Sequence, residues 1–114
     1  MLSKKYRLKK KSAFTATYKI KNSFDKNGIV LFVGKKKCDD TPTKVGFVVS
    51  KKIHKRAVKR NRIKRLMRES VRLIIKDNAL NTNCMSLIFV ASTKLLGKNF
   101  VEIDKAIKKL VIKL

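Results

Sequence analysis

The feature that most constrains this chain is a basic run from Lys51 to Arg68 that also carries the periodicity of an amphipathic helix. The run has no carboxylate, and its ten cations are Lys51, Lys52, Lys55, Arg56, Lys59, Arg60, Arg62, Lys64, Arg65 and Arg68. Apolar residues recur at three- and four-residue spacing, the pattern of one helix face: Ile63, Leu66, Met67, Val71 and Ile74. The segment that continues to Lys76 is therefore predicted to be a helix that packs on a core and exposes its cations.

The cations of this helix fall on two flanks of the apolar face. One row follows a four-residue spacing, namely Arg60, Lys64, Arg68 and Arg72, while Arg62 and Arg65 lie toward the other side. Glu69 is the only acid of the segment, and like charges at this spacing oppose helix formation. A solvated basic face is the ordinary explanation for a charge run. The six guanidinium groups between Arg56 and Arg72 favour phosphate binding instead, because each can contact phosphate through two N–H groups.

Composition limits the remaining possibilities. The chain has 114 residues, 31 Lys and Arg, seven Asp and Glu, and a formal net charge of +24, which favours a polyanionic partner. Hydrophobic residues make up 44% of the chain, enough for a core, and the length suits one domain over residues 1–114, which its charge makes a nucleic-acid-binding domain. No apolar stretch is long enough to span a bilayer, so we expect a cytoplasmic protein. Cys38 and Cys84 are isolated, without the spacing of a zinc or redox site.

The basic run resembles a known family signature. Arg60-Asn61-Arg62-Ile63-Lys64-Arg65 is similar to the hallmark of the bacterial ribonuclease P protein subunit, which is Arg-Asn-Arg, a hydrophobic residue and Lys-Arg. The similarity extends over nearly the whole chain. The other segments that resemble the family are 6–9, 14–18, 45–50, 86–91 and 100–110.

The local patterns predict a single-domain α+β sandwich in the order helix, strand, strand, helix, strand, helix. The first helix is expected from Ser12, as its cap, to Ile20, and residues 22–28 are expected to form a polar turn. The predicted strands are 29–33, 45–50 and 86–91, the first two close enough to pair antiparallel. A turn at 39–42 is expected between the first two strands and a loop at 77–83 before the third, and Asn99 caps a last helix to Leu114.

The helix between the second and third strands allows these two strands to pair in parallel. The general rule makes such a crossover right-handed. The family resemblance implies a left-handed crossover instead, and no residue pattern in the chain decides between the two.

The resemblance also implies which side chains meet RNA. The expected RNA-binding residues are Lys51, Lys52, Arg56, Arg60, Asn61, Arg62, Lys64, Arg65 and Arg68. Phe14, Tyr18 and Phe32 are expected in a cleft for single-stranded substrate, where rings can stack on unpaired bases. Their spacing and surroundings alone leave packing in the core equally open. Thr17 stands where the family more often has an aliphatic residue.

No catalytic constellation is evident in the sequence. The chain has one histidine, His54, and its seven carboxylates are scattered, whereas ribonuclease chemistry needs an acid–base pair or clustered metal ligands. The resemblance implies that a catalytic RNA subunit performs the reaction and holds magnesium, while this protein binds that RNA and the 5′ leader of precursor tRNA, with no membrane partner. A small ribosomal protein or a nucleoid-type DNA binder remains the alternative, and a membrane-surface role is disfavoured because the apolar helix face is needed for the core.

Overall fold

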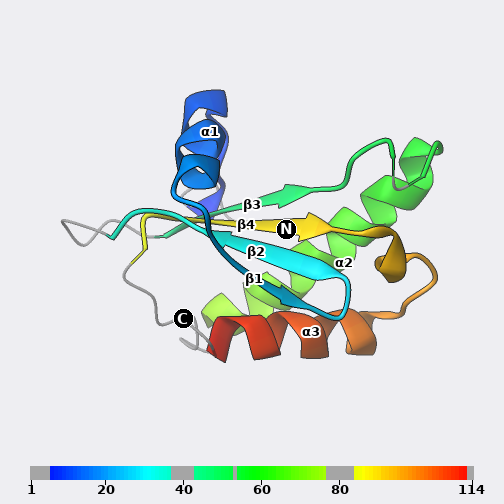
Figure 1. Ribbon diagram of the computed structural model, residues 1–114. Helices are drawn as coiled ribbons and strands as arrows, with labels where there is room; N and C mark the ends of the chain where they lie inside the picture. Colours follow the sequence, from blue (N-terminus) through cyan, green and yellow to red (C-terminus); the bar gives the residue numbers. More distant parts are fainter. Residues whose placement is uncertain (1–5, 37–42, 53, 77–83, 113–114) are drawn as a thin grey trace.

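A four-stranded sheet carries one helix on one face and two on the other (Figure 1). The computed structural model describes residues 6–36, 43–52, 54–76 and 84–112. Its elements, in chain order, are α1 (Lys11–Lys19), β1 (Asn22–Lys26), β2 (Ile29–Val33), β3 (Lys44–Val48), α2 (Ala57–Lys76), β4 (Ser86–Ala91), the 3-10 turn η2 (Thr93–Leu95) and α3 (Phe100–Ile112). The α+β class and the three predicted helices are confirmed. The predicted turn at 39–42, the loop at 77–83, Cys38 and Leu114 lie outside the described residues.

The segment predicted as a polar turn, residues 22–28, is mostly a strand. β1 pairs antiparallel with β2, and the hairpin closes at Asn27 and Gly28, whose φ angles are 49° and 94°. Asn-Gly is the favoured pair for a tight hairpin because both central residues need positive φ. β1 lies at the sheet edge and exposes most of its side chains, so its polar composition concealed it.

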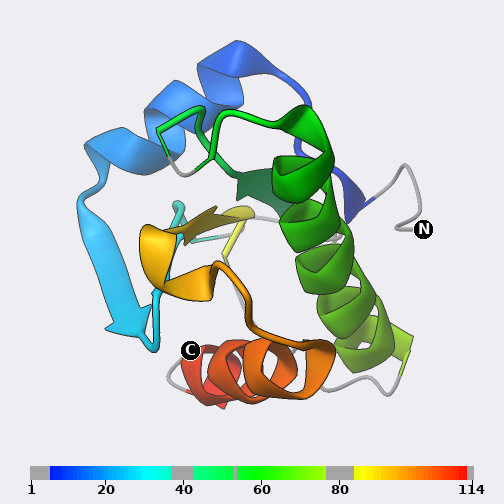
Figure 2. The ribbon, with the colours of Figure 1, turned by 90° about the vertical axis from the view of Figure 1, so that its right-hand side faces the viewer.

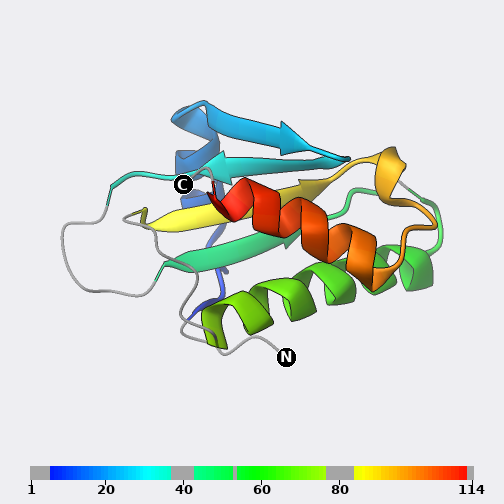
Figure 3. The same cartoon turned by 90° about the horizontal axis from the view of Figure 1, so that it is seen from below.

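The predicted antiparallel pairing of strand 29–33 with strand 45–50 is wrong. The sheet order is β1-β2-β4-β3, so β4 lies between β2 and β3 and pairs antiparallel with the former and parallel with the latter. β4 takes the interior position because five of its six residues are buried. The parallel pairing of β3 with β4 agrees with prediction. Figure 3 shows α2 and α3 toward the viewer and the chain passing from β3 through α2 to β4 as a left-handed crossover, as the resemblance implied.

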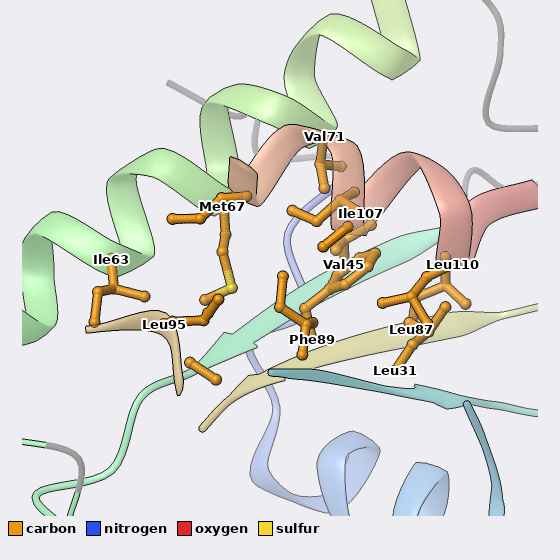
Figure 4. Packing of buried hydrophobic residues seen from close by; sticks show 14 of the residues in the cluster. Leu31, Val45, Ile63, Met67, Val71, Leu87, Phe89, Leu95, Ile107 and Leu110 are labelled. Carbon is orange, nitrogen blue, oxygen red and sulfur yellow. The ribbon is translucent and has the colours of Figure 1, made fainter. Parts of the chain in front are cut away.

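The core lies between the sheet and the pair α2 and α3. The stripe of α2 is buried as predicted at Ile63, Met67, Val71 and Ile74, while Leu66 is only partly buried. Figure 4 shows Met67 and Ile63 directed toward Leu95 and Phe89, on the side of the sheet that α3 also covers. The buried residues of α3 are Ile103, Ala106, Ile107 and Leu110. Both helices thus present their charged sides to solvent because their apolar sides meet one core.

The predicted cap of the first helix is wrong, and the predicted cap of the last helix is confirmed. α1 begins at Lys11, one residue before Ser12, because the N–H groups of Ala13 and Phe14 bond to the Lys10 carbonyl, so the Ser12 hydroxyl is not the cap. Asn99 does cap α3, since its Oδ1 accepts from the Glu102 N–H at 3.0 Å.

Replacing Met67 by alanine tests how strongly α2 is held. Met67 is fully buried, so the loss of its side chain leaves a cavity and should lower the free energy of unfolding by roughly 2–5 kcal/mol. Arg65→Ala, an exposed change on the same helix, is the control and should alter stability by less than about 0.5 kcal/mol. Urea unfolding of both variants measures the difference; equal losses would mean that the stripe does not anchor α2.

Candidate nucleic-acid interface

The cations of α2 and of the segment before it are predominantly exposed. Lys51 and Lys52 follow β3, and the first turn of α2 has no acidic residue. A helix N-terminus carries partial positive charge, which normally favours acidic side chains there. Cations at this position repel the helix end and one another, so an external anion would stabilise this part of the molecule.

The guanidinium of Arg60 is engaged by two carbonyl groups of the protein itself. Its Nη1 donates to the carbonyl oxygens of His54 at 2.8 Å and Lys55 at 2.9 Å. The N–H of Arg56 donates to Nδ1 of His54 at 3.0 Å, so the single described histidine acts as a hydrogen-bond acceptor at the start of α2. Arg60 and His54 together fix the segment that leads into the helix. The sequence predicted Arg60 as an RNA ligand but gave no sign of this internal role.

A groove of about 350 Å³ lies beside α2 and combines cations with an aromatic ring. It is lined by Arg7, Leu8, Lys9, Phe14, Val45, Gly46, Phe47 and Arg68. The N-terminal segment forms one wall because the Leu8 N–H donates to the Val45 carbonyl at 2.9 Å, beside β3. Arg68 reaches the groove from α2, whereas Phe14 comes from α1. The predicted cleft residue and the predicted RNA-binding residue therefore meet in one site.

Gly46 explains how Phe14 comes so near the sheet. A Cβ added to Gly46 would lie 2.6 Å from Cζ of Phe14, so only glycine leaves room for the ring against the β3 backbone. Phe14 is half-buried and retains an accessible part at the groove.

The other two predicted cleft residues contact each other on the same face of the sheet. The rings of Tyr18 and Phe32 pack edge to face, with centroids 4.9 Å apart, and both side chains are half-buried. Partial burial raises the pKa of the Tyr18 hydroxyl above its ordinary value. Partial burial gives all three rings a packing role and leaves part of each accessible; their contact with RNA stays a prediction.

Thr17 holds α1 on the sheet by a polar contact that the sequence did not reveal. Its Oγ1 lies 2.6 Å from the hydroxyl of Ser86 on β4, and it also donates to the Ala13 carbonyl at 2.8 Å. Both hydroxyl-bearing residues are buried. Thr17 is thus matched by a serine 69 residues away along the chain.

The two flanks of α2 face different surroundings. Arg68 lines the groove beside Phe14, while Arg62 lines a second pocket of about 300 Å³ with Lys59, Ile63, Leu96 and Gly97. Arg62 Nη1 also donates to the Lys98 carbonyl at 3.3 Å. Lys64 is half-buried, whereas Asn61 and Arg65 are exposed. The helix therefore has two basic sides, as predicted. Contact of either side with RNA stays a prediction.

Arg72, the last cation of the four-residue row, is neutralised locally. Its Nε and Nη2 donate to the two carboxylate oxygens of Glu69 at 3.1 Å and 2.6 Å. The hydrogen bond from Arg72 lowers the pKa of Glu69 below its ordinary range. By contrast, Arg65 and Arg68 have no ion-pair or hydrogen-bond partner within the described part of the chain. Arg68 is therefore available to a ligand in a way that Arg72 is not.

Carboxylates outside α2 are scattered. Asp104 accepts from Ser70 at 2.6 Å and pairs with Lys108 at 2.9 Å. Among residues 6–36, 43–52, 54–76 and 84–112, no three His, Cys, Asp or Glu side chains gather as metal ligands. Across the same residues, no helix has both the length and the apolar character required of a membrane span.

Comparison with known proteins gives consistent matches over nearly the whole chain. The family model described as Ribonuclease P matches residues 2–114. A curated relative, the ribonuclease P protein component of Clostridium kluyveri, is 42% identical over 108 residues, covering 95% of this chain and 93% of its own. A second relative, the ribonuclease P protein component of Clostridioides difficile, is 39% identical and covers 91% of this chain and 87% of its own.

Solved structures give the same result. A Staphylococcus aureus ribonuclease P protein, solved as a mutant with defective mRNA degradation activity, superposes with a TM-score of 0.79 at 26% identity, covering 95% of this chain and 86% of that one.

Glu69→Gln tests whether the carboxylate keeps Arg72 away from nucleic acid. The change removes the negative charge of residue 69 and one of the two oxygens that accept from Arg72, so the guanidinium is held less strongly and becomes more available to a phosphate. The slope of log K against log salt for RNA binding should steepen by roughly 0.7–0.9. Glu102→Gln makes the same charge change on α3 and is the control. Equal slopes in the two variants would attribute any effect to net charge and contradict the role given to Glu69.

Proposed function

This chain belongs to the bacterial ribonuclease P protein family, and on that premise we propose that it binds a catalytic RNA subunit through α2 and holds the 5′ leader of precursor tRNA in the groove between α1, β3 and α2. Membership makes it a protein subunit of ribonuclease P, involved in processing the 5′ ends of tRNA. The single observation that carries the leader proposal is the groove where Phe14 of α1 and Arg68 of α2 lie together. The predicted alternatives, a small ribosomal protein or a nucleoid-type DNA binder, gain no support from the comparisons.

The groove suits a single strand because it offers two kinds of contact. Arg68, Arg7 and Lys9 supply positive charge for the backbone, and the Phe14 ring supplies a surface on which a base can stack. Such contacts position RNA without reading its sequence, as a subunit that serves many precursor tRNAs requires.

The outer cations of α2 suit the RNA subunit. Arg62 and Arg65 are exposed and, by helical spacing, are turned away from Arg68. Lys51, Lys52, Arg56 and Asn61 extend the exposed polar surface at the start of the helix. Neutralising phosphates there releases counterions and lowers the repulsion between two RNA molecules held close together. The protein would thereby stabilise a particle whose two RNA components meet on opposite sides of one helix.

We assign the cleavage itself to the RNA subunit, with magnesium held mainly by that RNA. The carboxylate of Glu69 accepts from Arg72, and that of Asp104 accepts from Ser70 and pairs with Lys108. Both carboxylates therefore already have partners and are poorly placed to bind a metal ion. The high positive charge also makes this surface a poor site for a divalent cation. The particle would act in the cytoplasm, where its precursor tRNA substrates are made.

Reconstitution tests this division of labour. The protein mixed with a bacterial ribonuclease P RNA should promote leader removal from precursor tRNA at low magnesium, whereas RNA-free protein should cleave neither precursor tRNA nor an mRNA. The mRNA is included because the S. aureus neighbour was a mutant defective in mRNA degradation activity. Multiple-turnover cleavage by RNA-free protein, abolished by His54→Ala, would contradict the assignment.

Phe14→Leu tests the groove, and Tyr18→Leu tests whether the Tyr18–Phe32 pair, which does not line the groove, also contacts the leader. Leucine keeps apolar bulk but removes the ring, so each variant should lose stacking of roughly 1–3 kcal/mol per base in the affinity of the particle for leader-bearing precursor tRNA. Affinity for tRNA without a leader should be unchanged. Phe24→Leu, a ring on β1 packed against the core, is the control and should alter the melting temperature more than binding. Unchanged leader-dependent affinity in both variants would assign these rings to packing alone.

A further inference from the structure

We propose that the pocket between the first turns of α2 and the η2–α3 connection holds one unstacked nucleotide of the RNA subunit. The pocket, about 300 Å³, is lined by Lys59, Arg62, Ile63, Leu96 and Gly97. This volume is at the lower end of the roughly 300–1,000 Å³ of small-molecule sites. The proposal rests on the proposed function and adds to it a defined subsite for one nucleotide.

The floor of the pocket is apolar and partly open to solvent. Leu96 has 38% of its surface exposed, and Ile63, which lines the pocket with it, belongs to the core. Gly97, at φ 79°, has no atom within 4 Å of the position of a Cβ, so this side of the wall is open. An aromatic base placed over Leu96 would cover its exposed surface.

The rim of the pocket is cationic. Lys59 and Arg62 project from successive turns of α2, and both are exposed. Arg62 uses Nη1 for the Lys98 carbonyl at 3.3 Å, a long hydrogen bond that leaves its other N–H groups for a phosphate. An apolar floor with cations at its edge matches a nucleotide, whose base is flat and uncharged and whose phosphate is anionic. A purely hydrophobic protein segment would leave both cations without partners.

The wall opposite α2 is held in place before any ligand binds. Leu95 is fully buried, and its carbonyl accepts from the Lys98 N–H at 3.2 Å, closing a turn around Leu96 and Gly97. Lys98 Nζ donates to the Asn27 carbonyl at 3.4 Å, which ties this turn to the β1–β2 hairpin. A preformed wall lowers the entropy lost when a nucleotide enters.

The pocket is separate from the leader groove. Figure 2 shows η2 and the start of α3 on one side of α2 and the N-terminal segment on the other. The two sites share no lining residue. A nucleotide in this pocket would therefore belong to an RNA segment that approaches α2 from the side opposite the leader.

Leu96→Ser tests the pocket, with Leu96→Met as the variant that keeps the apolar floor. Affinity for the catalytic RNA should fall about tenfold for Leu96→Ser and less than about twofold for Leu96→Met, since serine removes the apolar surface that the base covers and methionine keeps it. Val101→Ser, an exposed apolar residue of α3 outside the pocket, is the control and should bind like the unaltered protein. Melting temperatures of the three variants should agree within a few degrees.

Probing of 2′-hydroxyl reactivity in the catalytic RNA gives a second readout. One unpaired nucleotide should change reactivity on binding the unaltered protein and should return toward its free reactivity with Leu96→Ser. If Leu96→Ser binds like Val101→Ser and leaves the reactivity pattern unchanged, the pocket holds no nucleotide and the inference is wrong. If the unaltered protein itself fails to bind the RNA or to promote leader removal, the proposed function fails instead.

Discussion

The packing of one apolar stripe of α2 determines where almost every functional side chain of this protein lies. Ile63, Met67, Val71 and Ile74 are buried between the sheet and α3. A chain with 31 Lys and Arg against seven Asp and Glu must place these cations where they repel least, at the surface. Because the stripe fixes the rotation of α2, it also fixes which cations face the groove beside α1 and which face the pocket beside η2.

The second constraint is the attachment of α1 and the N-terminal segment to the opposite face and edge of the sheet. The Thr17–Ser86 contact and the hydrogen bond from Leu8 to Val45 hold these segments, and Gly46 admits the Phe14 ring. None of these contacts involves α2. The groove therefore forms between two parts of the molecule that are anchored independently, and it brings aromatic and cationic groups together without burying either fully.

Patterns of spacing predicted the helices, the stripe of α2 and the cap at Asn99, because these depend on residues close together in the chain. β1 was missed because an edge strand exposes most of its side chains and thus lacks an apolar signature, although Asn27-Gly28 is a hairpin signal. The order of the strands could not be predicted, since it depends on which strand is buried on both faces.

The internal roles of Arg60 and Thr17 were also beyond the sequence, for a different reason. Arg60 donates to carbonyl groups five and six residues earlier, and Thr17 meets a hydroxyl on a distant strand. Such polar contacts have no periodic pattern. The placement of Arg68 and Arg62 on two sides of α2, by contrast, followed from helical spacing alone.

Photocrosslinking tests most directly whether one helix serves two RNA molecules. A photoreactive residue is introduced in place of Arg68 in one variant and of Arg62 in another, and each is assembled with a bacterial ribonuclease P RNA and precursor tRNA. The two-sided arrangement predicts that position 68 crosslinks to the 5′ leader and position 62 to the catalytic RNA. Crosslinks from both positions to the same RNA in the same proportions would contradict it and make α2 a uniform basic surface.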